Sequence, residues 1–297
     1  MTLLETLHEQ FGHLPGVRFE PGQGGLLCLR IANAHAEAEI YLHGAHVTQF
    51  QPADESPVLF VSANSEFVEG KPIRGGVPII FPWFGPREGT ELHGIVRLMN
   101  WDVAEVRQAD GETIVALQLD SDSQPHPNWP GRCALRYEVS VGRALRLTLR
   151  VENRGEEPFT FEEALHTYFA VGDARRIGIS GLQCREFIDK TDNFARKTQS
   201  DELLRLNGET DSVYFDAGTR CVIEDEANAR RIAVAKSHSA TTVVWNPWIA
   251  KAATMPDFGD DEWPQMVCVE TCNALDGAIT LAPGGSHEMT AVIEVER

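Results

Sequence analysis

The chain has 297 residues, of which 42% are apolar and 24% charged, as in soluble globular proteins long enough to bury a full core. Its 44 acidic and 26 basic side chains give a formal net charge of −18. This charge argues against nucleic acid or an anionic membrane as a partner, because phosphate polyanions need a basic surface. A small anionic ligand needs only a local group of arginines, so such groups are informative in this chain.

The N-terminal stretch predicts a short helix. Leu3, Leu4, Leu7 and Phe11 recur at helical spacing. The stretch lacks the basic start and long apolar run of a secretory signal, and no segment reaches the length of a membrane span. Six cysteines scattered through a chain of this size are unlike a disulfide scaffold. We therefore expect a cytoplasmic protein with reduced thiols.

The rest of the chain predicts strand after strand. The clearest case is residues 144–153, where four apolar side chains (Leu145, Leu147, Leu149 and Val151) alternate with polar ones, as in an antiparallel sheet with one wet face. Further strands are predicted at 37–42, 57–61, 113–119, 134–141, 220–224, 231–235, 241–245, 266–273, 278–281 and 288–296. Helices and strands do not alternate, which argues against a doubly wound parallel fold. We predict a mainly β protein, a large antiparallel β-sandwich, with residues 1–297 as a single domain because no linker or repeat divides them.

Residues 71–97 stand out as a rigid, irregular segment. Four prolines and a glycine pair keep this segment out of helix and allow close backbone approach. We expect it to carry Arg74, Arg87, His93 and Arg97 on its rim, where rigid loops often hold binding residues. The alternative is a proline-rich sheet edge with solvated arginines.

His166 is a candidate acid or base. Within residues 158–172, alternation places His166 with Glu162, Ala164 and Tyr168, opposite the most apolar face of a central strand. Histidine can exchange protons near neutral pH because its reference pKa lies there. A single histidine on a strand is, however, more often a structural polar residue.

Glu270 is the one charged residue in the apolar stretch 266–273, where it shares a face with Cys268 and Cys272. Buried carboxylates are rare unless paired, and burial raises their pKa into the range of a general base. The two cysteines lack the second pair that a structural zinc site needs, and His43 and His46 are equally insufficient. We therefore predict no metal site and read Glu270 as a functional candidate.

Three further stretches could line a ligand site. Trp245 and Trp248 could form a platform for a sugar, because aromatic faces suit the C–H faces of a pyranose. Residues 257–262 form an acidic loop of the kind usually found on solvated surface. The polar turn at 187–193 could add a carboxylate that bonds to a ligand, or be an ordinary surface turn.

Seven sequence blocks, in one order, resemble the glucose-6-phosphate 1-epimerase family of the aldose 1-epimerase superfamily. They are IRGGVPIIFPWFGP, LHGIVR, EALHTYF, FIDKTDN, VVWNPW, DFGDDEW and MVCVETCN. The resemblance runs from about Gly24 to the C-terminus. It implies a galactose-mutarotase-like β-sandwich and cofactor-free interconversion of the α and β anomers of a hexose 6-phosphate. The chain departs from the family pattern at Leu92, where some relatives have Gln, and at Val96, where Ala is common.

The resemblance also implies roles for individual residues. His166 and Glu270 would be the catalytic pair, and Arg74, His93, Arg97 and Asp189 would contact substrate, the two arginines at the phosphate. Glu270 would take the proton of the C1 hydroxyl while His166 protonates the ring oxygen, after which the ring opens, turns about C1–C2 and closes. His166 must then be protonated, so we expect an acceptor that supports it.

Two other functions stay open from the sequence. A mutarotase of unphosphorylated aldoses would have no use for Arg97, and a non-catalytic sugar-phosphate-binding protein would have no use for both His166 and Glu270. We expect a small-molecule hexose phosphate as the partner. We also expect a monomer, because the acidic surface has no obvious apolar stripe.

Overall fold

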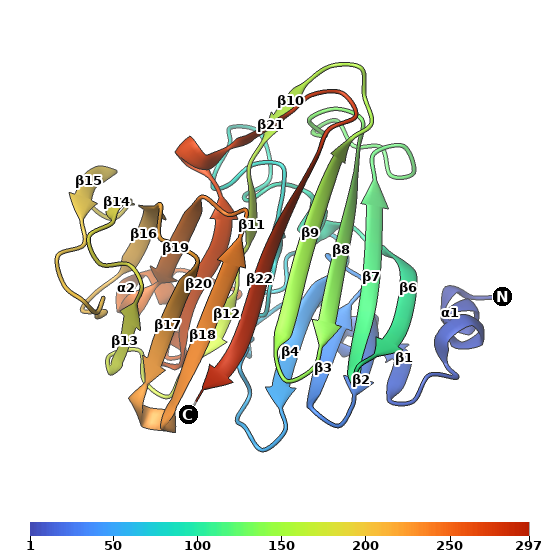
Figure 1. The fold of residues 1–297 in the computed structure, drawn as a ribbon, viewed down its shortest axis with the longest axis horizontal. Coiled ribbons are helices and arrows are strands. Elements are labelled where there is room, and N and C mark those ends of the chain that lie inside the picture. The colour runs from blue at the N-terminus through green and yellow to red at the C-terminus, as the bar shows by residue number, and fades with distance from the viewer. Residues whose placement is uncertain (297) are drawn as a thin grey trace.

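The computed structural model describes residues 1–296, which form antiparallel sheets (Figure 1). The site sheet runs in the order β15 (Ala195–Thr198), β14 (Glu186–Asp189), β16 (Thr210–Phe215), β19 (Thr241–Asn246), β20 (Met266–Asn273), β11 (Glu163–Leu165) and β5 (Ile79–Ile80), and β12 (Tyr168–Ala170) also pairs with β20. The outer sheet runs β13 (Ile177–Ser180), β17 (Arg220–Asp225), β18 (Arg230–Ser237), β22 (Ser286–Glu296), β9 (Leu145–Asn153), β8 (Cys133–Val141), β7 (Glu112–Asp120) and β6 (Asp102–Ala109).

A third, N-terminal sheet contains β1 (Val17–Pro21), β2 (Leu27–Ala32), β3 (Ala36–Tyr41) and β4 (His46–Pro52), and β10 (Phe159–Phe161) pairs with β21 (Ile279–Leu281). The helices are α1 (Leu3–Phe11), α2 (Trp248–Ala252) and the short 3₁₀ turns η1 (Gln23–Gly25), η2 (Val96–Leu98), η3 (Glu226–Asn228), η4 (Trp263–Gln265) and η5 (Leu275–Gly277). No helix within residues 1–296 is both long and apolar enough to cross a membrane.

The predicted N-terminal helix is confirmed as α1. Thr2 and Glu5 cap it reciprocally: the Glu5 amide donates to the Thr2 hydroxyl and the Thr2 amide to the Glu5 carboxylate. Leu7 is buried, and the ring of Phe11 lies 6.1 Å from that of Phe19 on β1. The helix therefore covers the N-terminal sheet, at the edge of the molecule (Figure 1).

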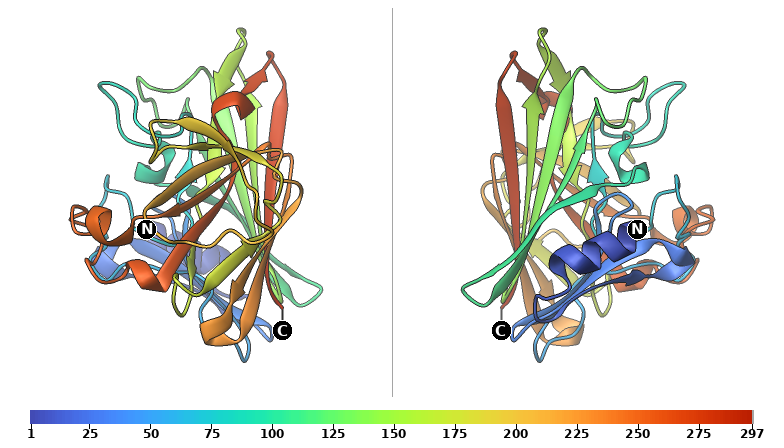
Figure 2. Two further views of the ribbon diagram at one scale, coloured as in Figure 1. Left: turned by 90° about the vertical axis from the view of Figure 1, so that its left-hand side faces the viewer. Right: turned by 90° about the vertical axis from the view of Figure 1, so that its right-hand side faces the viewer.

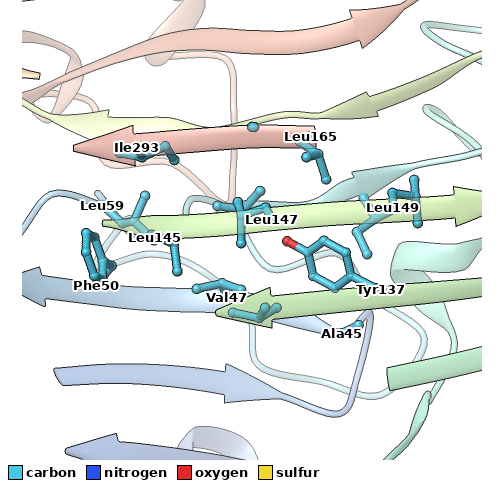
Figure 3. Close-up of a cluster of buried hydrophobic side chains, with 14 of the residues drawn as sticks. Ala45, Val47, Phe50, Leu59, Tyr137, Leu145, Leu147, Leu149, Leu165 and Ile293 are labelled. Atoms are coloured by element: carbon cyan, nitrogen blue, oxygen red, sulfur yellow. The ribbon is translucent and has the colours of Figure 1, made fainter. Parts of the chain in front are cut away.

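The two large sheets and the N-terminal sheet share one core. Viewed edge-on, the outer sheet forms one layer and the N-terminal sheet lies opposite it (Figure 2). Leu145, Leu147 and Leu149 of β9 are fully buried, as their alternation predicts, and lie among Phe50, Tyr137 and Leu165 (Figure 3). The core contains residues from Leu7 to Ile293. The single-domain organisation stays a prediction, which this shared core supports.

Two predicted strands differ in the structure. Residues 57–61 form only isolated bridges, Leu59 with Phe169 and Val61 with Gly75, so the strand predicted there is wrong. The continuous strand predicted within 158–172 is divided into β10, β11 and β12. Both β11 and β12 pair with β20 in one register, and His166 and Thr167, between them, lie opposite Glu270 and Val269.

A buried ion pair of the outer sheet contacts the backbone of residues 56–57 and of β12. Arg230 on β18 and Asp225 on β17 are 2% and 0% exposed in their side chains, with Nε 3.2 Å from Oδ2. The Arg230 guanidinium also donates to three backbone carbonyls, those of Ser56, Pro57 and Ala170, the last residue of β12. Its charge is therefore paired, and four of its five N–H donors are used.

We predict that Arg230→Met lowers the free energy of unfolding by about 3–5 kcal/mol, because it leaves the Asp225 carboxylate buried without its cation. Arg231→Met is the matched control. Arg231 is next in sequence, 45% exposed and paired with exposed carboxylates, so its loss should cost less than about 1 kcal/mol. Urea unfolding of both variants measures the difference. Equal effects would contradict the role given to Arg230.

Candidate active site

Strand β20 places Glu270 at the centre of the site sheet. All eight of its residues are buried, and it pairs with β19 on one side and with β11 and β12 on the other. Val267 and Val269 join the main core, whereas Cys268 and Cys272 pack on the opposite face, as the alternation predicts. Burial raises the pKa of Glu270 well above its usual range, and the nearby Asp211 charge acts in the same direction.

His166 lies beside Glu270 because β11 and β12 keep one register on β20. Leu165 pairs with Thr271 and Tyr168 with Cys268, so the two residues between them lie alongside the middle of β20. The His166 amide donates to the Pro78 carbonyl, and Nε2 lies 3.4 Å from Oε1 of Glu270. The structure thus brings the two predicted catalytic residues into contact.

Aromatic rings fix the plane of the His166 imidazole. The Tyr168 ring stacks on it at 4.9 Å with an interplanar angle of 11°, and Trp245 meets it edge-on at 6.2 Å. Burial lowers the pKa of His166 well below its usual range, and the charges of Arg74 and Arg97 lower it further. The acceptor expected to support a protonated His166 is not found: within residues 1–296, no hydrogen-bond partner reaches its buried Nδ1.

Arg74 is held in the site by a carboxylate and a phenol. Its Nε and Nη2 donate to Oδ2 of Asp257 at 3.1 and 2.9 Å, and its Nη1 donates to the Tyr168 hydroxyl at 3.0 Å. The acidic loop 257–262 is therefore only in part the solvated surface that its composition predicts: Asp260 and Asp261 are exposed, whereas Asp257 is half-buried against Arg74. Glu262, in the same loop, accepts hydrogen bonds from the Ser62 hydroxyl and the Ala63 amide.

Arg97 is buried rather than placed on a rim. It lies in the 3₁₀ turn η2, so the prediction that residues 71–97 contain no helix is wrong at this turn. Arg97 is 7% exposed; its Nη2 donates to the Leu92 carbonyl at 2.6 Å, and its buried Nε has no partner in the described chain. No carboxylate of residues 1–296 pairs with it. Burial and the charge of Arg74 lower the pKa of Arg97 to about 10.

His93 presents a single hydrogen-bond donor. Its Nδ1 accepts the Gly85 amide at 3.0 Å, so in the neutral ring the proton is on Nε2. The ring lies edge-on to His166 at 5.6 Å. The following Gly94 has φ of 72°, and a Cβ there would lie 1.9 Å from the Phe81 carbonyl oxygen, so only glycine fits this turn.

Asp189 does not join this group. It pairs in register with Ser212, and Ser212 with Val244 of the core face, so Asp189 points to the opposite side of the site sheet from Glu270. Its carboxylate accepts hydrogen bonds from Lys197 at 2.7 Å and from the Thr191 hydroxyl at 2.6 Å. The structure therefore does not bring Asp189 together with Glu270, and its role as a substrate contact stays a prediction.

Asp211 and Lys190 occupy the place expected for Asp189. Asp211 pairs in register with Trp245, and Trp245 with Cys268, which puts its side chain on the Glu270 face. Lys190 lies 2.9 Å from the Asp211 carboxylate and 5.6 Å from the centre of the Phe84 ring. Asp211 was not predicted, because no strand was expected at 210–215, and Lys190 lies in the polar turn 187–193, of which only a carboxylate was considered. The alternation of Asp211, Val213 and Phe215 was the available signal.

The remaining candidates have structural roles. Trp248 packs on Trp263 at 4.2 Å, so of the predicted tryptophan platform only Trp245 contacts the His166 ring. Nε2 of His43 and of His46 contacts the carbonyls of Lys71 and Gly75, which ties β4 to the segment that carries Arg74. Among the described residues, no group of three or more His, Cys, Asp or Glu side chains is placed to hold a metal ion.

Comparison with known proteins identifies the family. The aldose 1-epimerase family model matches residues 27–294. The chain belongs to the aldose 1-epimerase family.

Relatives of this aldose 1-epimerase family member are similar over most of their length. A protein of Escherichia coli (strain K12) named "Putative glucose-6-phosphate 1-epimerase" is 36% identical over 82% of each chain. A protein of Cenchrus ciliaris with the same name is 35% identical over 83% of this chain and 78% of its own.

Solved structures confirm the predicted fold. The crystal structure of a "putative mutarotase" from Salmonella typhimurium has a TM-score of 0.90 at 29% identity, covering 98% of this chain and 99% of that one. A galactose mutarotase-like protein from Clostridium acetobutylicum has a TM-score of 0.76 at 16% identity, covering 95% and 98%. The galactose-mutarotase-like β-sandwich is therefore established for this chain.

We predict that Glu270→Gln lowers the rate of anomer exchange by at least about 10²-fold, because an amide cannot accept the C1 proton. The free energy of unfolding should not fall, since burial already disfavours the ionised carboxylate. Exchange spectroscopy by NMR and urea unfolding measure the two quantities. A variant that keeps a tenth of the wild-type rate would rule out Glu270 as the base.

Asp211→Asn and Asp189→Asn form a matched pair that tests the strand parity. Asp211 lies on the Glu270 face of the site sheet. Asp211→Asn should therefore reduce kcat/KM for anomer exchange about tenfold or more, a loss typical of a hydrogen bond to a charged group. Asp189, on the other side of the sheet, should change it less than about twofold. The opposite ranking in a steady-state assay would support Asp189 as the substrate contact.

Proposed function

We propose that this protein interconverts the α and β anomers of a hexose 6-phosphate, with glucose 6-phosphate as the best substrate, and so has glucose-6-phosphate 1-epimerase activity. The observation that carries the proposal is Arg97: a buried guanidinium without a carboxylate partner, in the electrostatic field that acts on His166. Burying an unpaired charge is costly, so such a group calls for an anion from outside the chain. The names of the relatives from Escherichia coli and Cenchrus ciliaris support the same substrate.

The phosphate site would consist of Arg97 and Arg74. Planar guanidinium groups match phosphate oxygens with paired N–H donors. Arg74 is oriented in advance by Asp257 and Tyr168, which lowers the cost of ordering it around the ligand. His93 adds one more donor through Nε2. These groups concentrate positive charge in one place on a protein whose formal net charge is −18.

The reaction follows from the contact between His166 and Glu270. The C1 hydroxyl and the ring oxygen are bonded to the same carbon, so side chains 3.4 Å apart can reach both. The Glu270 carboxylate takes the hydroxyl proton while the His166 imidazolium protonates the ring oxygen. The aldehyde turns about C1–C2, and the ring closes with the two roles reversed. Each such group typically contributes about 10²–10⁴-fold.

Other side chains would position the sugar. Trp245, edge-on to both His166 and Tyr168, offers an apolar ring face to sugar C–H groups. The Asp211 carboxylate and the Lys190 ammonium offer an acceptor and a donor to ring hydroxyls, beside Glu270. The oligomeric state and the cellular location stay predictions from the sequence.

Arg97→Met separates the phosphosugar from the free sugar. Loss of a charge-assisted contact costs about 1.5–3 kcal/mol, so kcat/KM for glucose 6-phosphate relative to glucose should fall roughly ten- to a hundredfold. Arg87→Met is the control, because Arg87 is exposed on the same segment and lies over the Trp83 ring. NMR exchange with both sugars gives the ratio. An unchanged ratio in Arg97→Met would favour a mutarotase of unphosphorylated aldoses, and absence of exchange in the wild type would favour a non-catalytic binding protein.

A further inference from the structure

The two arginines of the site act on only one member of the catalytic pair. Arg74 and Arg97 act on His166, and both oppose a positive charge on its ring, but neither is among the charges that act on Glu270. Asp211 acts on Glu270, and Lys190, which forms an ion pair of 2.9 Å with Asp211, acts on both His166 and Glu270. An anion bound at the two arginines would therefore act mainly on His166.

Burial of His166 and Glu270 opposes the protonation states that the proposed reaction needs. Burial favours a neutral imidazole and a neutral carboxylic acid, whereas the reaction needs an imidazolium and a carboxylate. Many proteins support an active-site imidazolium through a carboxylate at Nδ1. Here Nδ1 of His166 is buried without a partner among residues 1–296, so the described chain does not supply that negative charge.

The other charged groups facing the pair are already balanced. Arg74 is paired with Asp257, and Lys190 with Asp211. His93 and the Cys268 and Cys272 thiols are held neutral, since burial lowers the pKa of the imidazole and raises those of the thiols. Burial likewise raises the pKa of the Tyr168 hydroxyl to about 12. Arg97 is the remaining cation without a counter-ion in the described chain.

We infer that the phosphate of the substrate is an activator as well as an anchor: bound at Arg97 and Arg74, it moves the shared proton from Glu270 to His166. The inference rests on the proposed function and deepens it. The O–H bond of the Glu270 carboxyl breaks and an N–H bond forms at Nε2 of His166, with no other reactant. The acid and the base of the reaction are thus created together, in the complex with a phosphosugar.

The first test supplies the two halves of the substrate separately. Anomer exchange of unphosphorylated glucose is measured by NMR with and without phosphite dianion. Saturating phosphite should accelerate exchange about tenfold or more, because each unit gained in the pKa of His166 raises its imidazolium fraction about tenfold. The acceleration should be lost in Arg97→Met and kept in Arg87→Met. Phosphite that inhibits exchange of glucose 6-phosphate competitively but leaves glucose exchange unchanged would overturn the inference.

The second test observes the proton directly and does not depend on phosphite. 1,5-Anhydroglucitol 6-phosphate lacks the C1 hydroxyl and cannot react. In protein with ¹⁵N-labelled histidine at pH 7, this ligand should give His166 the nitrogen shifts of an imidazolium, whereas saturating 1,5-anhydroglucitol should leave a neutral ring. His166→Asn assigns the signals. A neutral ring in both complexes would overturn the inference.

The two proposals fail in different ways. If the wild-type protein does not exchange the anomers of glucose 6-phosphate, the proposed function is wrong. If it exchanges them while His166 stays neutral in the phosphosugar complex, the function stands and the activating role of phosphate is wrong.

Discussion

The common register of β11 and β12 on β20 is the constraint on which the site depends. Both segments pair with β20, so the two residues between them must lie alongside its middle, where Glu270 projects. The His166 amide donates to the Pro78 carbonyl and the Tyr168 amide to the Gly76 carbonyl, on the side of the strand away from β20. The proline-rich segment therefore does more than carry Arg74: its backbone also holds the segment that carries His166. The contact between His166 and Glu270 thus follows from the pairing of the strands.

Burial then decides the electrostatics of the site. Each charge near the pair is moved out of water, which costs several kcal/mol unless a partner compensates it. Asp257 compensates Arg74, and Asp211 compensates Lys190, while Arg97 has only one backbone carbonyl. Among the cations near the pair in residues 1–296, Arg97 is thus the buried one without a carboxylate partner, so a bound anion would compensate its charge. This is how a strongly acidic chain can favour a doubly charged ligand.

The sequence predicted those features that depend on the residues of a single strand. The alternation at Leu145–Val151 predicted β9, and the isolated charge among apolar neighbours predicted a buried Glu270. Where long-range packing decides, sequence reasoning failed. Strand parity separated Asp189 from Asp211, and the packing around η2 buried Arg97, which reads as a loop residue. The position of His166 beside Glu270 could not be predicted, because it reflects pairing with residues more than a hundred positions away.

The buried arginine of the outer sheet has a consequence for motion in the site. Arg230 donates to the carbonyl of Ala170, at the end of the strand that begins with Tyr168, whose ring stacks on His166. Local opening of β12 would release that bond and admit water to a fully buried guanidinium. The bond from Arg230 therefore makes local unfolding of β12 costly, although β12 is only three residues long. It thereby helps to keep the Tyr168 ring stacked on His166. A side chain of the outer sheet thus helps to hold the tyrosine that stacks on His166 in the site sheet.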